Sequence, residues 1–132
     1  MEYINVITPV HKFDESVKGF LAKAINSYDE ASKLKKKKKD ELGTKLTIVC
    51  PERLMADIDS FISDIEWSNK CSVLCNNSGK IDFCSQINFA VENIQEKYFS
   101  ILEFDDEYYK KWFWQFSQYQ LGNADVSIFL PV

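Results

Sequence analysis

The sequence predicts a three-layer α/β/α domain built on a mostly parallel sheet of about five strands. Short runs rich in Val, Ile, Phe and Leu alternate along the chain with longer stretches whose apolar residues recur every three or four positions. Strands that alternate with helices in this way are typical of βαβ units, whose helices cover both faces of a parallel sheet. The chain has 132 residues, 45% of them hydrophobic, which suits one domain with one core. We therefore interpret residues 1–132 as a single domain.

Each expected element follows from its local pattern. The expected strands are β-rich runs at residues 3–8, 45–50, 71–75, 98–103 and 125–130. Helical spacing is found at residues 14–28, 54–65, 81–94 and 107–121. Asp14 and Ser16 can cap the first helix, and Gly122 can end the last one, because glycine commonly follows a helix.

The charge balance bears on the partners of the chain. The net charge is −4, yet six of the 16 basic residues are lysines within residues 33–39. The rest of the chain is therefore acidic, which disfavours nucleic acid as a partner, because that binding depends on basic groups. The lysine-rich segment 33–39 fits an exposed connection near a helix end, and a membrane or nucleic-acid patch is the alternative. No apolar run is long enough for a transmembrane segment.

The cysteines and the single histidine indicate no obvious metal or disulfide chemistry. The sequence does not open with a signal peptide, so we expect a reducing, cytoplasmic setting. Cys71 and Cys75 on one strand would lie ~13 Å apart, beyond the reach of a disulfide. A zinc site would need closer ligand spacing or a second histidine beside His11. We expect buried free thiols at Cys50, Cys71, Cys75 and Cys84, and an ordinary loop residue at His11.

Four carboxylates follow the fourth expected strand, at Glu103 and residues 105–107. Parallel sheets gather the carboxyl ends of their strands at one edge, where ligands usually bind. Like charges this close raise one another's pKa unless they are solvated, cap a helix or share a cation. Oxygen ligands suit Mg²⁺ or Mn²⁺, so one interpretation is a cation site. The other is that the acids decorate the N-terminus of the aromatic helix.

Three segments resemble family-2 glycosyltransferases with a GT-A fold. Residues 4–11 read INVITPVH and resemble the family's opening strand, V-I-I-P-x-Y-N. Residues 77–79 (NSG) and 87–93 (INFAVEN) are similar to its N-x-G … R-N-x-G-I-x-x-A stretch. Residues 98–108, YFSILEFDDEY, resemble Y-I-x-F-L-D-x-D-D, the strand that ends in the metal-binding D-x-D motif. The segments follow the family's order over nearly the whole chain.

The resemblance implies the Rossmann-like, nucleotide-sugar-binding half of such an enzyme. It implies a nucleoside-diphosphate sugar as ligand and a divalent Mn or Mg ion as cofactor. The metal ligands would be Asp105 and Asp106. The residues that would contact the nucleotide sugar are Thr8, Pro9, Glu52, Asn77, Asn88 and Glu103.

The chain departs from the family pattern at several positions. Glu103 occupies the place of the first Asp of D-x-D, and Ile87 that of an Arg. Residues 50–53 read CPER where the family has D-D-G-S, so Glu52 would have to recognise the base. The family's catalytic base comes later than Val132, so we expect it, with the acceptor-binding part, beyond this sequence.

An alternative function is that of a catalytically inactive, glycosyltransferase-like assembly protein. Trp112, Phe113 and Trp114 are consecutive, and three successive residues cannot all face one core from one helix. We expect Trp114 to be exposed, where this region could bind a protein partner or a second copy. A helix buried on two sides is the other interpretation of the same residues.

Overall fold

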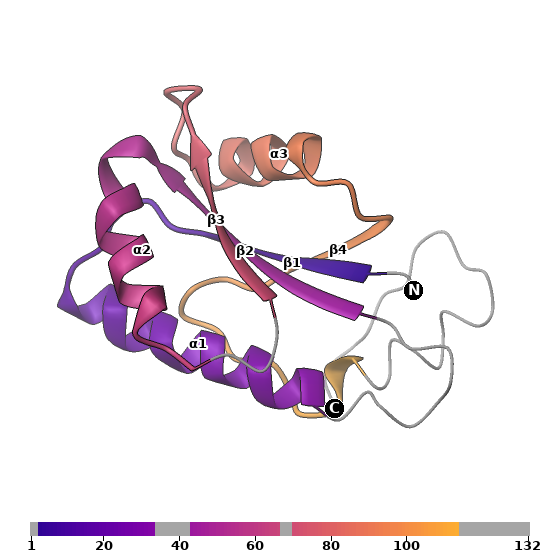
Figure 1. The fold of residues 1–132 in the computed structure, drawn as a ribbon. Helices are drawn as coiled ribbons and strands as arrows, with labels where there is room; N and C mark the ends of the chain where they lie inside the picture. Colours follow the sequence, from indigo (N-terminus) through magenta and orange to yellow (C-terminus); the bar gives the residue numbers. More distant parts are fainter. Residues whose placement is uncertain (1–2, 34–42, 67–69, 114–132) are drawn as a thin grey trace.

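A computed structural model describes residues 3–33, 43–66 and 70–113 of the chain. Strands and helices alternate along these residues, as predicted (Figure 1). The strands are β1 (Tyr3–Pro9), β2 (Gly43–Pro51), β3 (Lys70–Asn76) and β4 (Tyr98–Ile101). The helices are α1 (Glu15–Lys33), the short 3-10 helix η1 (Glu52–Leu54), α2 (Met55–Ser63) and α3 (Phe83–Asn93).

The described strands form one parallel sheet in the order β3-β2-β1-β4. The pairing continues just past the strand ends. Val10 N–H donates to Val49 O at 2.9 Å, and Leu102 N–H donates to Ile7 O at 3.0 Å. The carboxyl ends of β1, β2 and β4 therefore meet at one edge of the sheet, which confirms the predicted parallel arrangement.

Helices α1 and α2 cover one face of the sheet (Figure 1). Leu21 and Tyr28 from α1 and Ile58 from α2 are fully buried there. They share one apolar cluster with Ile4 and Val6 of β1. This face holds the larger part of the core.

Helix α3 lies on the opposite face (Figure 1). Its Ile87 and Ala90 form a smaller apolar cluster with Ile7 of β1 and Val49 of β2. Ile7 is thus buried on the opposite side from Ile4 and Val6, as the alternation of side chains along a strand requires. The three-layer α/β/α architecture is confirmed.

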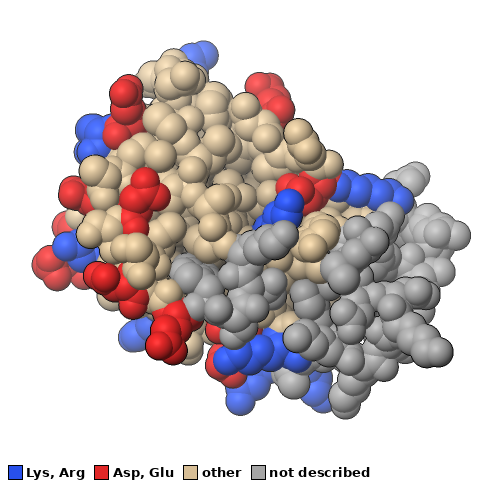
Figure 2. Space-filling model, viewed as in Figure 1, with Lys and Arg blue, Asp and Glu red and all other residues tan. Residues whose placement is uncertain are grey.

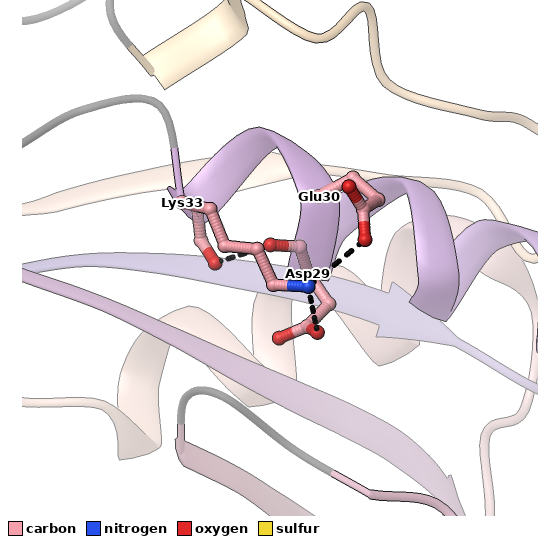
Figure 3. Close-up of polar contacts among 4 residues, drawn as sticks. Asp29, Glu30 and Lys33 are labelled. Atoms are coloured by element: carbon pink, nitrogen blue, oxygen red, sulfur yellow. Dashed lines mark hydrogen bonds and ion pairs between the residues drawn. The ribbon is translucent and has the colours of Figure 1, made fainter.

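Both ends of α1 carry charged groups that suit their positions. Asp14 Oδ1 accepts from the Val17 N–H at 2.9 Å, so Asp14 is the predicted N-terminal cap. Lys33, the last residue of α1, lies between two carboxylates, 2.9 Å from Glu30 Oε1 and 3.6 Å from Asp29 Oδ2 (Figure 3). Its cation sits at the helix C-terminus, where positive charge is favourable. Residues 34–39 of the predicted lysine-rich connection lie outside the described residues.

The segment after β4 differs from the prediction. The strand ends at Ile101, two residues earlier than expected, and residues 107–111 are not helical; helical geometry begins at Trp112. The cause is a pair of contacts that Tyr108 makes outside its own segment. The Tyr108 N–H donates to Ser27 Oγ at 2.8 Å, and the Tyr108 hydroxyl lies 2.6 Å from Ser100 Oγ. The remainder of the expected helix and the strand expected at residues 125–130 lie outside the described residues.

The aromatic run at residues 112–114 is partly built into the core. Phe113 is fully buried and meets the Tyr28 ring edge-on, with centroids 5.9 Å apart. Trp112 is half-buried and stacks on Tyr108 at 5.2 Å. Trp114, the residue expected to be exposed, lies outside the described residues.

The four cysteines are free thiols, and their burial differs. Cys50 is buried and Cys71 half-buried, and burial raises the pKa of both thiols to about 12. Cys84 is exposed on the first turn of α3, so the prediction of buried thiols is wrong there.

Charge is spread over the surface that Figure 2 shows. Acidic and basic side chains are interspersed around the rim of this face, and uncharged residues form its centre. Among the residues that the structure describes, no helix combines the length and the apolar character needed to cross a bilayer.

Candidate functional site

A cavity of about 440 Å³ opens at the edge where β1 and β4 end. Pro9 and His11 line it from the end of β1, and Glu103 and Phe104 line it from the loop after β4. The remaining wall comes from the start of α3, with Ile81, Asp82, Phe83 and Gln86. A cavity therefore lies at the carboxyl edge of the sheet, where a parallel fold predicts a ligand site.

The start of α3 is fixed against the sheet by its own polar residues. Asp82 Oδ2 accepts from the Ser85 N–H at 3.1 Å, which caps the helix. Hydrogen bonding from the Ser85 side chain, and then from this N–H, lowers the pKa of Asp82. One turn later, Gln86 Nε2 donates to Val10 O at 3.0 Å. This bond ties the first turn of α3 to the end of β1, so the helical wall of the cavity is held in place.

The loop that leads into this helix closes on itself. Asn76 is buried at the end of β3, and its Nδ2 donates to Lys80 O at 2.9 Å. Its Oδ1 accepts from both the N–H and the hydroxyl of Ser78, at 3.0 and 2.6 Å. Gly79 has a φ of +82°, a conformation that favours glycine. A single buried amide thus shapes the connection between β3 and the cavity.

The acidic loop lies directly beside the cavity. The Asp106 N–H donates to Glu103 O at 3.0 Å, which folds residues 103–106 into a tight turn. Partial desolvation, followed by the charges of Asp106 and Asp105, raises the pKa of Glu103. Because helical geometry begins only at Trp112, the interpretation that these acids decorate a helix N-terminus is wrong.

Asp105 and Asp106 suit a weakly held, hydrated cation better than a closed metal site. Both side chains are exposed. Across residues 3–33, 43–66 and 70–113, no three His, Cys, Asp or Glu side chains are grouped as metal ligands. Mg²⁺ usually keeps several waters and uses one or two carboxylates together with substrate phosphates. The residues present fit that mode of binding.

The structure brings some of the predicted contact residues together and places others away from the cavity. Pro9 and Glu103 line it. Thr8 is buried at the end of β1 but does not line the cavity, and its Oγ1 has no hydrogen-bond partner among the described residues. The other predicted contacts are exposed and do not line this cavity: Glu52 in η1, Asn77 after β3 and Asn88 on α3.

Six lining residues carry no sequence prediction of a role in binding: His11, Ile81, Asp82, Phe83, Gln86 and Phe104. His11 is exposed at the mouth, and its carbonyl oxygen accepts from Arg53 Nη2 at 2.9 Å. The sequence contained a signal that could have identified Gln86, because it is a polar residue on the buried face of an otherwise apolar helical pattern. The sequence also contained a signal for Asp82, because this residue stands three positions before Ser85, where a helix cap is expected.

Comparison with known proteins adds a likeness of fold. No protein-family model matches the sequence, and no curated protein does either. A crystal structure of S. aureus TarS residues 1–349 matches with a TM-score of 0.56 and 17% identity, over 92% of this chain and 33% of that one. A longer structure of S. aureus TarS matches with a TM-score of 0.54 and 15% identity, over 92% of this chain and 20% of that one.

These likenesses concern the fold and only part of each TarS chain. At this level of identity the likeness shows that this chain shares the fold of the matched part of TarS. It spans between a fifth and a third of the length of the TarS structures that it matches.

Proposed function

We propose that this chain binds a nucleoside-diphosphate sugar together with a divalent cation, as the donor-binding part of a glycosyltransferase. One observation carries the proposal: the 440 Å³ cavity and the acidic turn at residues 103–106 meet at the carboxyl edge of the sheet. The glycosyltransferase-like fold supports it, as does the resemblance of residues 98–108 to a D-x-D strand.

In this proposal the acidic turn binds the cation and the diphosphate, and the cavity holds the uncharged parts of the nucleotide sugar. The carboxylates of Asp105 and Asp106 hold Mg²⁺ or Mn²⁺ through exposed oxygens. When bound, the cation neutralises the diphosphate and stabilises it as a leaving group. Glu103, which belongs to the turn and lines the cavity, faces the ribose or the sugar, and Pro9 packs against the nucleotide.

The lining of the cavity supports a small organic ligand. Its wall is mainly apolar, from Pro9, Ile81, Phe83 and Phe104, with a few polar groups among them. Pockets for small molecules commonly have this composition, in which apolar area contributes affinity and a few polar groups fix orientation. Donor binding is the part of the function that the described residues can carry.

Isothermal titration calorimetry of the full chain tests the proposal. UDP, GDP and dTDP are titrated with Mg²⁺, with Mn²⁺ and with a chelator. We expect at least one nucleotide to bind only when the metal is present, because its diphosphate would otherwise approach uncompensated carboxylates. Asp105→Asn keeps the shape of the side chain and removes its charge, and should weaken this binding at least about tenfold.

The control is Asp57→Asn, an exposed acid in the first turn of α2 that does not line the cavity. It should bind like the wild type. Nucleotide binding that is independent of metal, or an unchanged affinity in Asp105→Asn, would contradict the proposal.

A further inference from the structure

The side-chain amide of Gln86 is buried in the wall of the cavity, and its carbonyl oxygen is unpaired. The side chain is 1% exposed, and its Nε2 donates to Val10 O. Its Oε1 has no hydrogen-bond partner among the described residues. A buried carbonyl oxygen without a partner costs free energy, so folded proteins rarely leave one without a reason.

The unpaired atom is fixed as an acceptor. Rotating the amide by half a turn would place Oε1 against Val10 O, and two acceptors repel each other. Val10 is itself held at the end of β1 by its N–H bond to Val49 O. The backbone of the sheet therefore sets the orientation of the Gln86 amide before any ligand arrives, which reduces the entropic cost of binding.

The surroundings of Gln86 exclude some ligands and favour others. Asp82 and Glu103 also line the cavity, so a phosphate there would meet two carboxylates and a carbonyl oxygen. Phe83, on the same turn of α3, is 45% exposed and offers an aromatic surface. An uncharged ring with one apolar face and hydroxyl donors matches both features, and a pyranose sugar has that chemistry.

We propose that Gln86 is a specificity-determining residue for the sugar of the donor. Its Oε1 accepts a hydrogen bond from a ring hydroxyl, while the apolar face of the sugar packs against Phe83. This inference rests on the proposed function and deepens it, because it assigns the sugar to the cavity and the diphosphate to the acidic turn.

The test compares each nucleotide with its sugar derivative in the Gln86→Met variant, which keeps the length of the side chain and removes the acceptor. UDP and UDP-glucose, GDP and GDP-mannose, and dTDP and dTDP-glucose are titrated with Mg²⁺ into the full chain, and the pair that binds the wild type most tightly is used. We expect Gln86→Met to weaken binding of the nucleotide sugar by about fivefold to tenfold, which corresponds to the loss of one hydrogen bond. The bare nucleotide should stay within about twofold of the wild type.

Two further variants make the result specific. Gln95→Met carries the same substitution at an exposed residue beyond the end of α3, in another groove, and should bind both ligands like the wild type. Phe83→Ala removes the exposed ring without disturbing the core. It should weaken binding of the nucleotide sugar and leave binding of the bare nucleotide unchanged. If Gln86→Met does not fold, Phe83→Ala decides: a selective loss supports the inference, and unchanged sugar binding overturns it.

The remaining outcomes separate this inference from the proposed function. Equal losses for nucleotide and nucleotide sugar in folded Gln86→Met would show a structural role and overturn the inference. Unchanged binding of the nucleotide sugar to Gln86→Met would mean that water satisfies Oε1, and would overturn the inference as well. The proposed function would still stand if nucleotide binding depended on the metal. If the wild type binds no nucleotide, the proposed function fails and the inference fails with it.

Discussion

At the residue scale, Glu96 shows how one carboxylate organises polar side chains of β1 and β2. Glu96 accepts from Lys45 Nζ and from Asn5 Nδ2, both at 2.8 Å, and Asn5 Oδ1 accepts from the Thr47 hydroxyl at 2.7 Å. The hydrogen bond from Lys45 lowers the pKa of Glu96. This network joins β1, β2 and the segment before β4, so a polar cluster replaces apolar packing there.

Replacement of Glu96 by Gln should lower the free energy of unfolding by about 1.5 kcal/mol at neutral pH, because a charged hydrogen bond is lost from a largely buried site. The lowered pKa means that ionised Glu96 is favoured in the folded protein. Its contribution is therefore present above the ordinary pKa of glutamate, near ~4.3, and is lost as the pH falls through the lower pKa of the folded state. Urea denaturation at about pH 7 and about pH 3 measures it. A difference between the two proteins that persists undiminished in acid would contradict this account.

At the scale of elements, local sequence patterns predicted the helices and caps that depend on contacts within one or two turns. The spacing of Val17, Leu21 and Tyr28 predicted α1, and the cap at Asp14 is a contact within one turn. The non-helical segment at residues 107–111 could not be predicted in this way. Its conformation depends on Ser27, 81 positions earlier in the sequence. Helical propensity there gives way to tertiary contacts, which a periodic pattern does not contain.

Ser27→Ala should therefore destabilise the protein by about 1 kcal/mol, because the Tyr108 N–H loses its acceptor. Ser63→Ala is a matched control. Both hydroxyls donate to the carbonyl oxygen three residues earlier, at 2.7 Å in Ser27 and 2.8 Å in Ser63, and the Ser63 side chain is exposed at the end of α2. Equal urea midpoints for the two variants would show that the contact with Tyr108 contributes nothing.

At the scale of the whole molecule, the topology explains which part of the site the sequence predicted. The rule that parallel strands end at one edge predicted a site near Pro9 and Glu103, and both line the cavity. The rule does not give the order of the strands. The order β3-β2-β1-β4 makes the crossover from β3 to β4 pass over β2 and β1. That crossover brings Phe83 and Gln86 to the cavity, so their place could be known only from the fold.

We propose that a cation binds at Asp105 and Asp106, beside the cavity. Titration of the ¹⁵N-labelled chain with substoichiometric Mn²⁺ tests it directly, because the ion broadens the amide signals nearest to it. We expect the strongest broadening at residues 103–106, followed by His11 and Phe83. The signals of Thr47 and Ile94, in the other groove, should stay sharp. Broadening centred on other acids, such as Glu15 or Glu30 of α1, or uniform broadening of all amides, would contradict it.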